Sequence, residues 1–373
     1  MNNWLEINAA AIRANLHQFQ KLVGKQRTAV VLKSNAYGHG LQEVFEILKG
    51  ENLKWICTNY LTEAKALRQL GFDDHILNVG PIFASELNDA VSWKCEVFIS
   101  SLEVLQSWLA NSHRPKAHIK FDTGLSRQGF LHEQHHEIIQ ALKPAWNDVA
   151  GVCTHFANVE DVLEQEYAQL QLSRFALIKQ AFEREGFKGL FHSAASASAL
   201  ILPESHFDLC RIGISLYGQW PSNATKLSYA NGHRKVIELE PAISWKSKVQ
   251  LVKPVKKGEF IGYGCTFRAA KDMKIALIPV GYFEGYPRIC SNSQTYVLIG
   301  DNRCQITGRI SMNMMVADVS HLTQVAANDE VVLMGRQGSE YISATDVASW
   351  AQTIHYELLT RLNADIPRLV TNR

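Results

Sequence analysis

TAVVLKSNAYGHG, residues 28–40, is the most informative segment of this chain. It begins with a short apolar, β-branched run, ends that run in Lys33, and passes into a turn that contains Gly-His-Gly. Similar runs recur before residue 215, and together they are TAVVLK (28–33), WICTN (55–59), HILNV (75–79), EVFIS (96–100), KAHIKF (116–121), VAGVCTH (149–155), GLFHS (189–193) and LCRIG (209–213). Strands of a parallel sheet that are buried on both faces are apolar throughout, so these runs predict eight parallel strands.

The segments between these runs carry apolar residues at helical spacing, as at Leu61, Ala64, Leu67 and Leu70. Eight strands that alternate with helices over this length predict a (β/α)8 barrel of the TIM type. A doubly wound open sheet is the competing architecture, because it has the same alternation of strands and helices.

The sequence changes character after residue 220. WPSNATKLSYANGHRK, residues 220–235, is polar and rich in turn-forming residues, as is typical of a domain boundary. Beyond it, the segment 242–255 alternates apolar and polar residues, and KIALIPV, TYVLIG, CQITGRI and EVVLMG are further strand candidates. We therefore predict a barrel domain over residues 1–230 and a mostly β-strand domain over residues 231–373. Residues 1–8 precede the first barrel helix and are a candidate strand of the second domain.

The composition indicates a globular chain that acts on small molecules. Of its 373 residues, 46% are apolar and 20% are charged, and the net charge of +2 includes no block of like charge that would favour nucleic acid or a membrane surface. The seven cysteines are widely spread without zinc-site spacing, so we expect reduced thiols and no metal. The N-terminal residues do not resemble a signal peptide, and no segment approaches the ~20 apolar residues of a membrane span. We expect a cytoplasmic protein.

Lys33 is the first candidate for chemistry. A lone lysine at the end of a strand usually just reaches solvent, because lysines are seldom buried unpaired. In a barrel, however, this end of the strands feeds the active site. Desolvation there would lower the pKa of the amine, which is the condition for forming an imine with an aldehyde cofactor.

Two later segments are candidates for binding a phosphate group. HSAASASAL (192–200) follows the seventh predicted strand and RIGISLYG (211–218) follows the eighth, where barrels often bind phosphate. Ser196 offers a hydroxyl group, while Gly213 and Ile214 offer backbone N–H groups. Each segment on its own also fits an ordinary helix start or glycine turn.

Six motifs in the same order resemble the alanine racemase family over nearly the whole chain. They are VVLKSNAYGHG (30–40), KFDTGLSRQG (120–129), GVCTHFANVED (151–161), RIGISLYG (211–218), GYGCTFRA (262–269) and GRISMN (308–313). The resemblance implies a pyridoxal 5'-phosphate enzyme that forms a homodimer with active sites at the subunit interface.

The same resemblance implies a pair of acid/base residues, Lys33 and Tyr263. Lys33 would carry the cofactor and exchange the α-proton on one face of the substrate, and Tyr263 from the partner subunit would serve the other face. Racemisation needs both, because the proton must return from the side opposite the one it left. A free tyrosine has a pKa of ~10, and His155 and Arg211 would supply the cationic, hydrogen-bonded setting that makes it a base.

The resemblance also implies that Arg211 contacts the ring of the cofactor. A guanidinium keeps its protons, so facing the ring nitrogen it leaves that nitrogen unprotonated and the ring a weaker electron sink. This favours immediate return of the proton over other reactions. A carboxylate here would instead indicate a decarboxylase or an aminotransferase.

The remaining positions carried over from the family surround the cofactor and the substrate. Tyr37 and Tyr356 would contact the cofactor phosphate, and His192 would flank the ring. Arg127 and the N–H of Met312 would hold the substrate carboxylate. In the family the lysine at the position of Lys120 is often carbamylated, and as a carbamate it would orient the arginine. Tyr282 and Arg309 would line the substrate entry. The chain departs from the family pattern at three positions. Ala195 replaces an asparagine, Ser34 replaces an alanine, and Asn313 replaces an aspartate in the substrate corridor, where the lost charge could alter which amino acids enter.

We predict a racemase that interconverts L-alanine and D-alanine and supplies D-alanine for peptidoglycan synthesis. Four alternatives remain. They are a racemase of broader specificity for serine or lysine, a fold-related decarboxylase, a non-catalytic pyridoxal-phosphate-binding barrel, and a phosphosugar-binding barrel without this cofactor.

Overall fold

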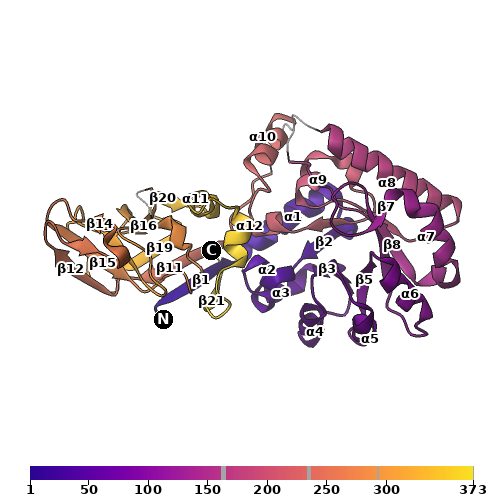
Figure 1. Ribbon diagram of the computed structural model, residues 1–373, viewed down its shortest axis with the longest axis horizontal. Coiled ribbons are helices and arrows are strands. Elements are labelled where there is room, and N and C mark those ends of the chain that lie inside the picture. Colours follow the sequence, from indigo (N-terminus) through magenta and orange to yellow (C-terminus); the bar gives the residue numbers. More distant parts are fainter. Residues whose placement is uncertain (161–164, 233–236, 292–293, 373) are drawn as a thin grey trace. The chain divides into compact units, whose positions relative to one another are not determined.

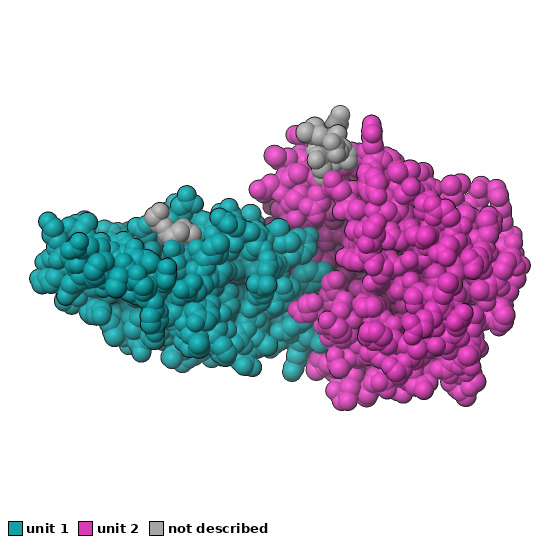
Figure 2. All heavy atoms as spheres, in the orientation of Figure 1, with its two compact units in different colours: residues 1–10, 35–43, 242–373 teal, residues 11–34, 44–241 magenta. Residues whose placement is uncertain are grey.

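A computed structural model describes residues 1–372 of the chain except 161–164, 233–236 and 292–293. The chain forms two compact units, which Figure 2 shows in different colours. Unit 1 comprises residues 1–10, 35–43 and 242–373, and unit 2 comprises residues 11–34 and 44–241. The short segment 35–43 therefore belongs with the C-terminal part of the chain, although it follows Lys33 closely in sequence.

Unit 2 is a barrel of parallel strands surrounded by helices (Figure 1). In spatial order the strands are β10 (Cys210–Ile212), β2 (Thr28–Val31), β3 (Trp55–Thr58), β4 (His75–Asn78), β5 (Cys95–Ile99), β6 (Ala117–Asp122), β8 (Val149–Cys153) and β9 (Leu190–His192). An isolated parallel bridge between Ala195 and Arg211 links the last strand back towards the first. This nearly closed eight-stranded barrel confirms the predicted TIM-type architecture and excludes the open sheet.

The barrel strands are short and buried, as their apolar sequences predict. Every residue of β2, β3 and β5 is buried, because helices cover the outside while side chains fill the inside. The short strand β7 (Phe130–Leu131) pairs only with β6. The helices of this part of the chain are α1 (Ala9–Val23), α3 (Leu41–Leu48), α4 (Leu61–Gln69), α5 (Leu87–Ser92), α6 (Leu102–Ala110), α7 (His135–Leu142), α8 (Glu166–Arg184), α9 (Ser196–Ile201) and α10 (Asn223–Gly232).

Unit 1 is built mainly from antiparallel strands. Its largest sheet runs in the order β17 (Asn302–Gln305), β16 (Tyr296–Ile299), β19 (Glu330–Gln337), β11 (Ile243–Lys248), β1 (Asn3–Asn8) and β21 (Arg368–Thr371), and β20 (Glu340–Ile342) pairs with β19. β1 pairs antiparallel with β11 and parallel with β21. The N-terminal strand is thus held between two strands from the C-terminal part of the chain.

The rest of unit 1 consists of smaller sheets and two helices. They are β12 (Leu251–Val255), β15 (Met273–Ile278) and β18 (Met315–Asp318) in one sheet, β13 (Phe260–Ile261) and β14 (Phe267–Arg268) in another, and the helices α11 (Ala344–Trp350) and α12 (His355–Thr360). Buried residues alternate along β11, where Ile243, Trp245 and Ser247 face inward. One-sided burial of this kind explains why the sequence of this part alternates while the barrel strands do not.

The described part of the segment 220–235 differs from the turn that its sequence predicts, and residues 233–235 lie outside the described residues. Residues 223–232 form the helix α10, in which Thr225 and Tyr229 are buried. The Ser222 hydroxyl accepts the backbone N–H of Thr225 at 3.0 Å and so begins the helix. Tertiary packing of these two side chains outweighs the weak helix propensity of the segment.

None of the helices in the described part of the chain combines the length and the apolar character needed to cross a bilayer.

Candidate active site

Lys33 lies just after the first barrel strand, where the backbone takes an unusual turn. The Leu32 N–H donates to the Cys57 carbonyl at 2.9 Å and keeps the chain beside β3 up to this point. The next element, α2 (Lys33–Tyr37), is left-handed, because its last four residues all have φ between +52° and +56°. A left-handed conformation costs about 1–2 kcal/mol for each such residue. Strain of this size persists where the surrounding structure holds it, as at functional sites.

Glu63 helps to hold this turn. Its carboxylate accepts the Ser34 N–H at 2.6 Å and the Asn59 N–H at 2.8 Å. One side chain thus ties the residue after Lys33 to the end of the neighbouring strand. Glu63, which also forms the capping box of α4, was not among the residues predicted from the sequence.

Two arginines of unit 2, Arg127 and Arg211, lie close enough to Lys33 and Lys120 to lower the pKa of both lysines. Burial and the Arg127 guanidinium lower the pKa of Lys33, which is half-buried. Burial also lowers the pKa of Lys120 to about 8, and the guanidinium groups of Arg127 and Arg211 act in the same direction. These cations repel one another, so the arrangement favours neutral lysine amines and would be stabilised by an anionic ligand.

Arg211 is buried and is held from several sides. It donates from Nη1 to His192 Nδ1, and from Nη2 to the carbonyls of Thr154 at 3.0 Å and Ser193 at 2.9 Å. Nη2 also lies 3.3 Å from His155 Nδ1. Burial and the Arg211 charge hold the pKa of both histidines well below the usual value. Both imidazoles are therefore neutral and act as acceptors towards the guanidinium.

Residues of the predicted phosphate site lie together. Ser196 begins α9, and its hydroxyl accepts the Gly213 N–H at 3.0 Å. Ile214 begins the short 3₁₀ turn that follows Gly213. A hydroxyl and backbone N–H groups at two adjacent chain segments form a donor set suited to an anion.

Asp122 is a site residue that the sequence analysis missed. Its Oδ1 accepts the N–H groups of Gly124, Leu125 and Ser126, and its Oδ2 accepts the Arg127 N–H at 3.0 Å. Burial by itself raises the pKa of Asp122. The backbone N–H donors lower this pKa by a larger amount, so the net shift is downward. The carboxylate thereby shapes the loop that carries Arg127. An aspartate just before a glycine-containing loop is the sequence signal that could have indicated this role.

In unit 1, Tyr263 and Arg309 lie beside each other. Tyr263 is the first residue of a short 3₁₀ turn, and its two neighbours in sequence, Gly262 and Gly264, have φ of +77° and +75°. Tyr263 is 72% exposed. A Cβ on Gly264 would lie 2.7 Å from Arg309 Nη1, so this glycine leaves room for the guanidinium. The exposed phenol is available to a group outside unit 1.

Two loops that carry Tyr282 and Met312 are joined by backbone hydrogen bonds. The Tyr282 N–H donates to the Ser311 carbonyl at 3.2 Å and the Phe283 N–H donates to the Met312 carbonyl at 2.8 Å. Both residues are exposed, Tyr282 at 43% and Met312, whose backbone N–H is the predicted donor, at 55%. The structure therefore places these predicted entry and substrate residues on one surface of unit 1.

The contacts of these loops explain why Asn313 is compatible with this site, although the family pattern has an aspartate at this position. Its side-chain amide donates to Glu284 Oε1 at 2.8 Å, while Glu284 Oε2 accepts the Gly281 N–H at 2.8 Å. A carboxylate therefore remains at this place even though residue 313 is uncharged. An aspartate at 313 would meet that carboxylate directly.

Tyr37 and Tyr356 also lie together in unit 1, with ring centroids 6.3 Å apart. Gly38 packs directly against α12, because a Cβ on it would lie 2.0 Å from the Leu359 carbonyl oxygen. This contact fixes the chain that leads from Lys33 to Tyr37.

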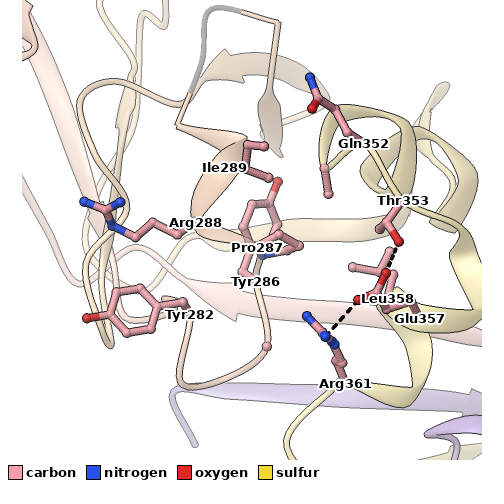
Figure 3. Close-up of a pocket in the computed structure, with 12 residues that line it drawn as sticks. Tyr282, Tyr286, Pro287, Arg288, Ile289, Gln352, Thr353, Glu357, Leu358 and Arg361 are labelled. Atoms are coloured by element: carbon pink, nitrogen blue, oxygen red, sulfur yellow. Dashed lines mark hydrogen bonds and ion pairs between the residues drawn. The ribbon is translucent and has the colours of Figure 1, made fainter.

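A pocket of about 600 Å³ lies in unit 1 (Figure 3). Tyr282 and Arg288 line one side of it, and Thr353, Glu357 and Arg361 line the other. Glu357 bonds to the hydroxyl of Thr353 and pairs with Arg361 at 2.9 Å. The pocket therefore combines one predicted entry residue with a fixed ion pair.

The fold and the site define the class of protein. A parallel (β/α)8 barrel that presents a lysine of lowered pKa after its first strand, and that is followed by a β-strand unit, is the architecture of a barrel enzyme with an added domain. Residues 7–221 match the family described as "Alanine racemase, N-terminal domain" and residues 242–370 match "Alanine racemase, C-terminal domain". The chain belongs to the alanine racemase family of isomerases.

Relatives and solved structures agree with this assignment. The alanine racemase of Leptospira interrogans is 36% identical and that of Carboxydothermus hydrogenoformans is 34% identical, over 100% and 98% of this chain and 96% and 98% of theirs. The structure is similar to alanine racemase from Clostridium difficile, with a TM-score of 0.91, 30% identity, and coverage of 100% of this chain and 97% of that one. It is also similar to alanine racemase from Bacillus anthracis with bound L-Ala-P, with a TM-score of 0.91, 29% identity, and coverage of 100% and 96%.

Proposed function

We propose that this protein is a pyridoxal-phosphate-dependent racemase that interconverts L-alanine and D-alanine. The observation that carries the proposal is the group of mutually repelling cations, Lys33, Lys120, Arg127 and Arg211, at the carboxyl ends of the barrel strands. Such a group is suited to an anionic cofactor and an anionic substrate group, provided that one lysine is neutral enough to react. Membership of the alanine racemase family supports the same conclusion.

The residues present fit pyridoxal phosphate. Lys33 would bond to its aldehyde carbon, since burial lowers the pKa of the amine. Ser196, Gly213 and Ile214 would bind its phosphate, together with Tyr37 and Tyr356. When bound, the cofactor supplies an electron-withdrawing ring that weakens the bond between the substrate α-carbon and its hydrogen.

Arg211 would face the ring nitrogen, and its contacts suit that role. Its acceptors, within the described part of the chain, are two neutral imidazoles and two backbone carbonyls. None of them can remove its charge, and His192 and Thr154 hold the guanidinium in place. A fixed donor at this place would keep the ring nitrogen of the bound cofactor unprotonated and would limit side reactions.

Lys33 and Tyr263 would move the proton. Lys33 serves one face of the α-carbon and the phenol of Tyr263 serves the other, which inverts the configuration. Because Tyr263 is exposed on unit 1, we infer that it completes the site of a partner subunit in a homodimer. His155, next to Arg211, would provide the hydrogen-bonded setting that a phenol needs to act as a base.

Arg127 would bind the substrate carboxylate, with the N–H of Met312 as second donor. Burial lowers the pKa of Lys120 to about 8, so a fraction of the molecules carry a neutral amine at this position. That amine can add to carbon dioxide and release a proton to form a carbamate anion. The resulting anion would orient Arg127 instead of repelling it. Tyr282 and Arg309, which lie on exposed loops of unit 1, would line the path of the substrate.

We further propose that the enzyme acts in the cytoplasm and supplies D-alanine for peptidoglycan. A broader specificity for serine or lysine is the second candidate, because the uncharged Asn313 leaves Glu284 as the carboxylate at this place in the entry loops.

The test is the formation of D-amino acids from L-alanine, L-serine and L-lysine by the purified protein supplied with pyridoxal phosphate. Tyr263→Phe should abolish most racemisation while the cofactor stays bound to Lys33, and Tyr60→Phe, at another exposed tyrosine, should change neither. Mixing Lys33→Ala chains with Tyr263→Phe chains should restore part of the activity, because some mixed dimers hold one intact site. Full activity of Tyr263→Phe in both directions would refute the two-base scheme.

A further inference from the structure

A continuous chain of hydrogen bonds runs through the barrel to Arg211. His75 Nδ1 bonds to Glu96 Oε1 at 2.5 Å, and Glu96 Oε2 bonds to His118 Nε2 at 2.8 Å. His118 Nδ1 then lies 2.8 Å from His192 Nε2, and His192 Nδ1 accepts from Arg211. Of these five residues, only His192 and Arg211 had a role predicted from the sequence.

The chain connects the two ends of the barrel. His75 is the first residue of β4, and Glu96 and His118 are each the second residue of their strands. His192 is the last residue of β9. The hydrogen bonds therefore begin near the amino ends of the strands and extend through the barrel interior to the site at the carboxyl ends.

The direction of every hydrogen bond in this chain follows from its two ends. Arg211 can only donate, so His192 Nδ1 must accept and its proton must lie on Nε2. That proton is donated to His118 Nδ1, which leaves the His118 proton on Nε2. The Nε2 proton is donated in turn to Glu96, a carboxylate that can only accept. Arg211 and Glu96 thus select one tautomer for each of the two histidines between them.

The surroundings are built to keep these groups in place. His118 and His192 are fully buried, and Glu96 is 8% exposed. A Cβ on Gly151, which pairs with His118 in the neighbouring strand, would lie 2.3 Å from His118 Nδ1, so the glycine makes room for the ring. Two hydrogen bonds, from His75 and His118, occupy both oxygens of Glu96 and hold its pKa down at about 2, although burial acts in the opposite direction.

The series of hydrogen bonds also connects two buried charges, those of Arg211 and Glu96. All the acceptors of Arg211 in the described residues are neutral, so the guanidinium has no carboxylate against it. Glu96 is the carboxylate at the far end of its hydrogen-bonded chain. Polarised imidazoles between the two carry part of that negative charge towards Arg211, because hydrogen bonds in series strengthen one another.

We propose that Glu96 is a positioning residue for Arg211, acting through His118 and His192 to fix the direction of their hydrogen bonds and the orientation of the guanidinium. The inference rests on the proposed function in one respect, namely that Arg211 faces the cofactor ring. Without the Glu96 carboxylate, His118 loses its obligatory acceptor and can present Nδ1–H to His192. His192 then has two donors against it and must rotate or release Arg211.

The decisive experiment is nuclear magnetic resonance of the full-length holoenzyme labelled with ¹⁵N-histidine. In the wild-type protein, His118 and His192 should each be neutral, protonated at Nε2 and unprotonated at Nδ1. Glu96→Leu, which leaves no acceptor for the His118 Nε2–H, should change this pattern at both rings. Glu185→Gln removes one negative charge from an exposed ion pair with Lys143 elsewhere in unit 2 and should leave the pattern unchanged.

Kinetics provide the second readout. Glu96→Leu should lower kcat by about tenfold or more, the usual effect of losing a residue that holds a functional group in its orientation. KM for alanine should change little, because Arg127 is outside this hydrogen-bonded chain. A purely structural role would instead lower stability without reversing the tautomers.

Two outcomes would overturn the proposal. One is a wild-type spectrum in which either ring is protonated at Nδ1, which decides the matter even if Glu96→Leu does not fold. The other is a folded Glu96→Leu protein with unchanged tautomers or unchanged kcat. If the wild-type protein racemises no amino acid, the proposed function fails, whereas the spectrum still tests the link between Glu96 and Arg211.

Discussion

Gly38→Ala is expected to destabilise unit 1 strongly, because Gly38 combines a left-handed backbone with a close contact. Its φ is +83°, and a Cβ would lie 2.0 Å from the Leu359 carbonyl oxygen, whereas ordinary contact begins at 3.4 Å. The left-handed conformation costs an alanine about 1–2 kcal/mol, and forcing extra volume into a packed place costs about 1–3 kcal/mol more. The free energy of unfolding should therefore fall by about 2–5 kcal/mol.

Gly300→Ala is the matched control in the same unit. Gly300 has a φ of +56°, but no atom lies within 4 Å of the position a Cβ would take. Only the backbone cost of about 1–2 kcal/mol should remain. The difference between the two variants isolates the contact with Leu359, which we expect to contribute about 1–3 kcal/mol.

Hydrogen exchange measured by mass spectrometry can follow this difference in the peptides of α12, since it reports local opening free energies. Exchange there should be much faster in Gly38→Ala than in Gly300→Ala. Affinity for pyridoxal phosphate should also fall in Gly38→Ala, because Tyr37 is displaced together with its neighbour. Equal exchange in the two variants would show that Gly38 serves only its backbone conformation and would refute this reasoning.

Three further changes test other parts of the site. Asp122→Asn places a donor against the Arg127 N–H, so KM for alanine should rise about tenfold with little change in kcat in steady-state assays; an unchanged KM would show that the loop holds without the carboxylate. Asn313→Asp sets a second carboxylate against Glu284 and should lower stability by up to about 1 kcal/mol in thermal unfolding, because the pair is exposed; adding Glu284→Gln should reverse the loss. A hydrogen bond to a buried carboxylate raises the pKa of His75 above 6.5. The stabilisation is therefore complete below that pH and is lost as the pH rises through the folded value, so the urea midpoint of His75→Gln should differ from wild type more at about pH 5.5 than at about pH 9.

The barrel could be predicted because its strands leave a simple trace in the sequence. A strand covered on both faces must be apolar at nearly every position, and β2, β3 and β5 show this along their whole length. The second unit was recognisable for the opposite reason, since its strands are covered on one side. The segment 223–232 was not recognisable as a helix, because burial of Thr225 and Tyr229 rather than local preference stabilises it.

Lys33 could be proposed from the chain alone, since residues that follow buried strands in a barrel gather at one end. Arg211, the middle residue of β10, was identified only through the resemblance to the family. The roles of Glu63, Asp122 and Glu96 could not be predicted, because each acts on groups brought to it by folding. A carboxylate in a sequence does not reveal which N–H groups it will meet. The local residue pattern was thus sufficient to predict the architecture and to propose Lys33 as the candidate reactive lysine. The contacts that lower its pKa, orient the arginines and select histidine tautomers arise from long-range packing, which brings together residues more than 100 positions apart in the case of Lys33 and Arg211.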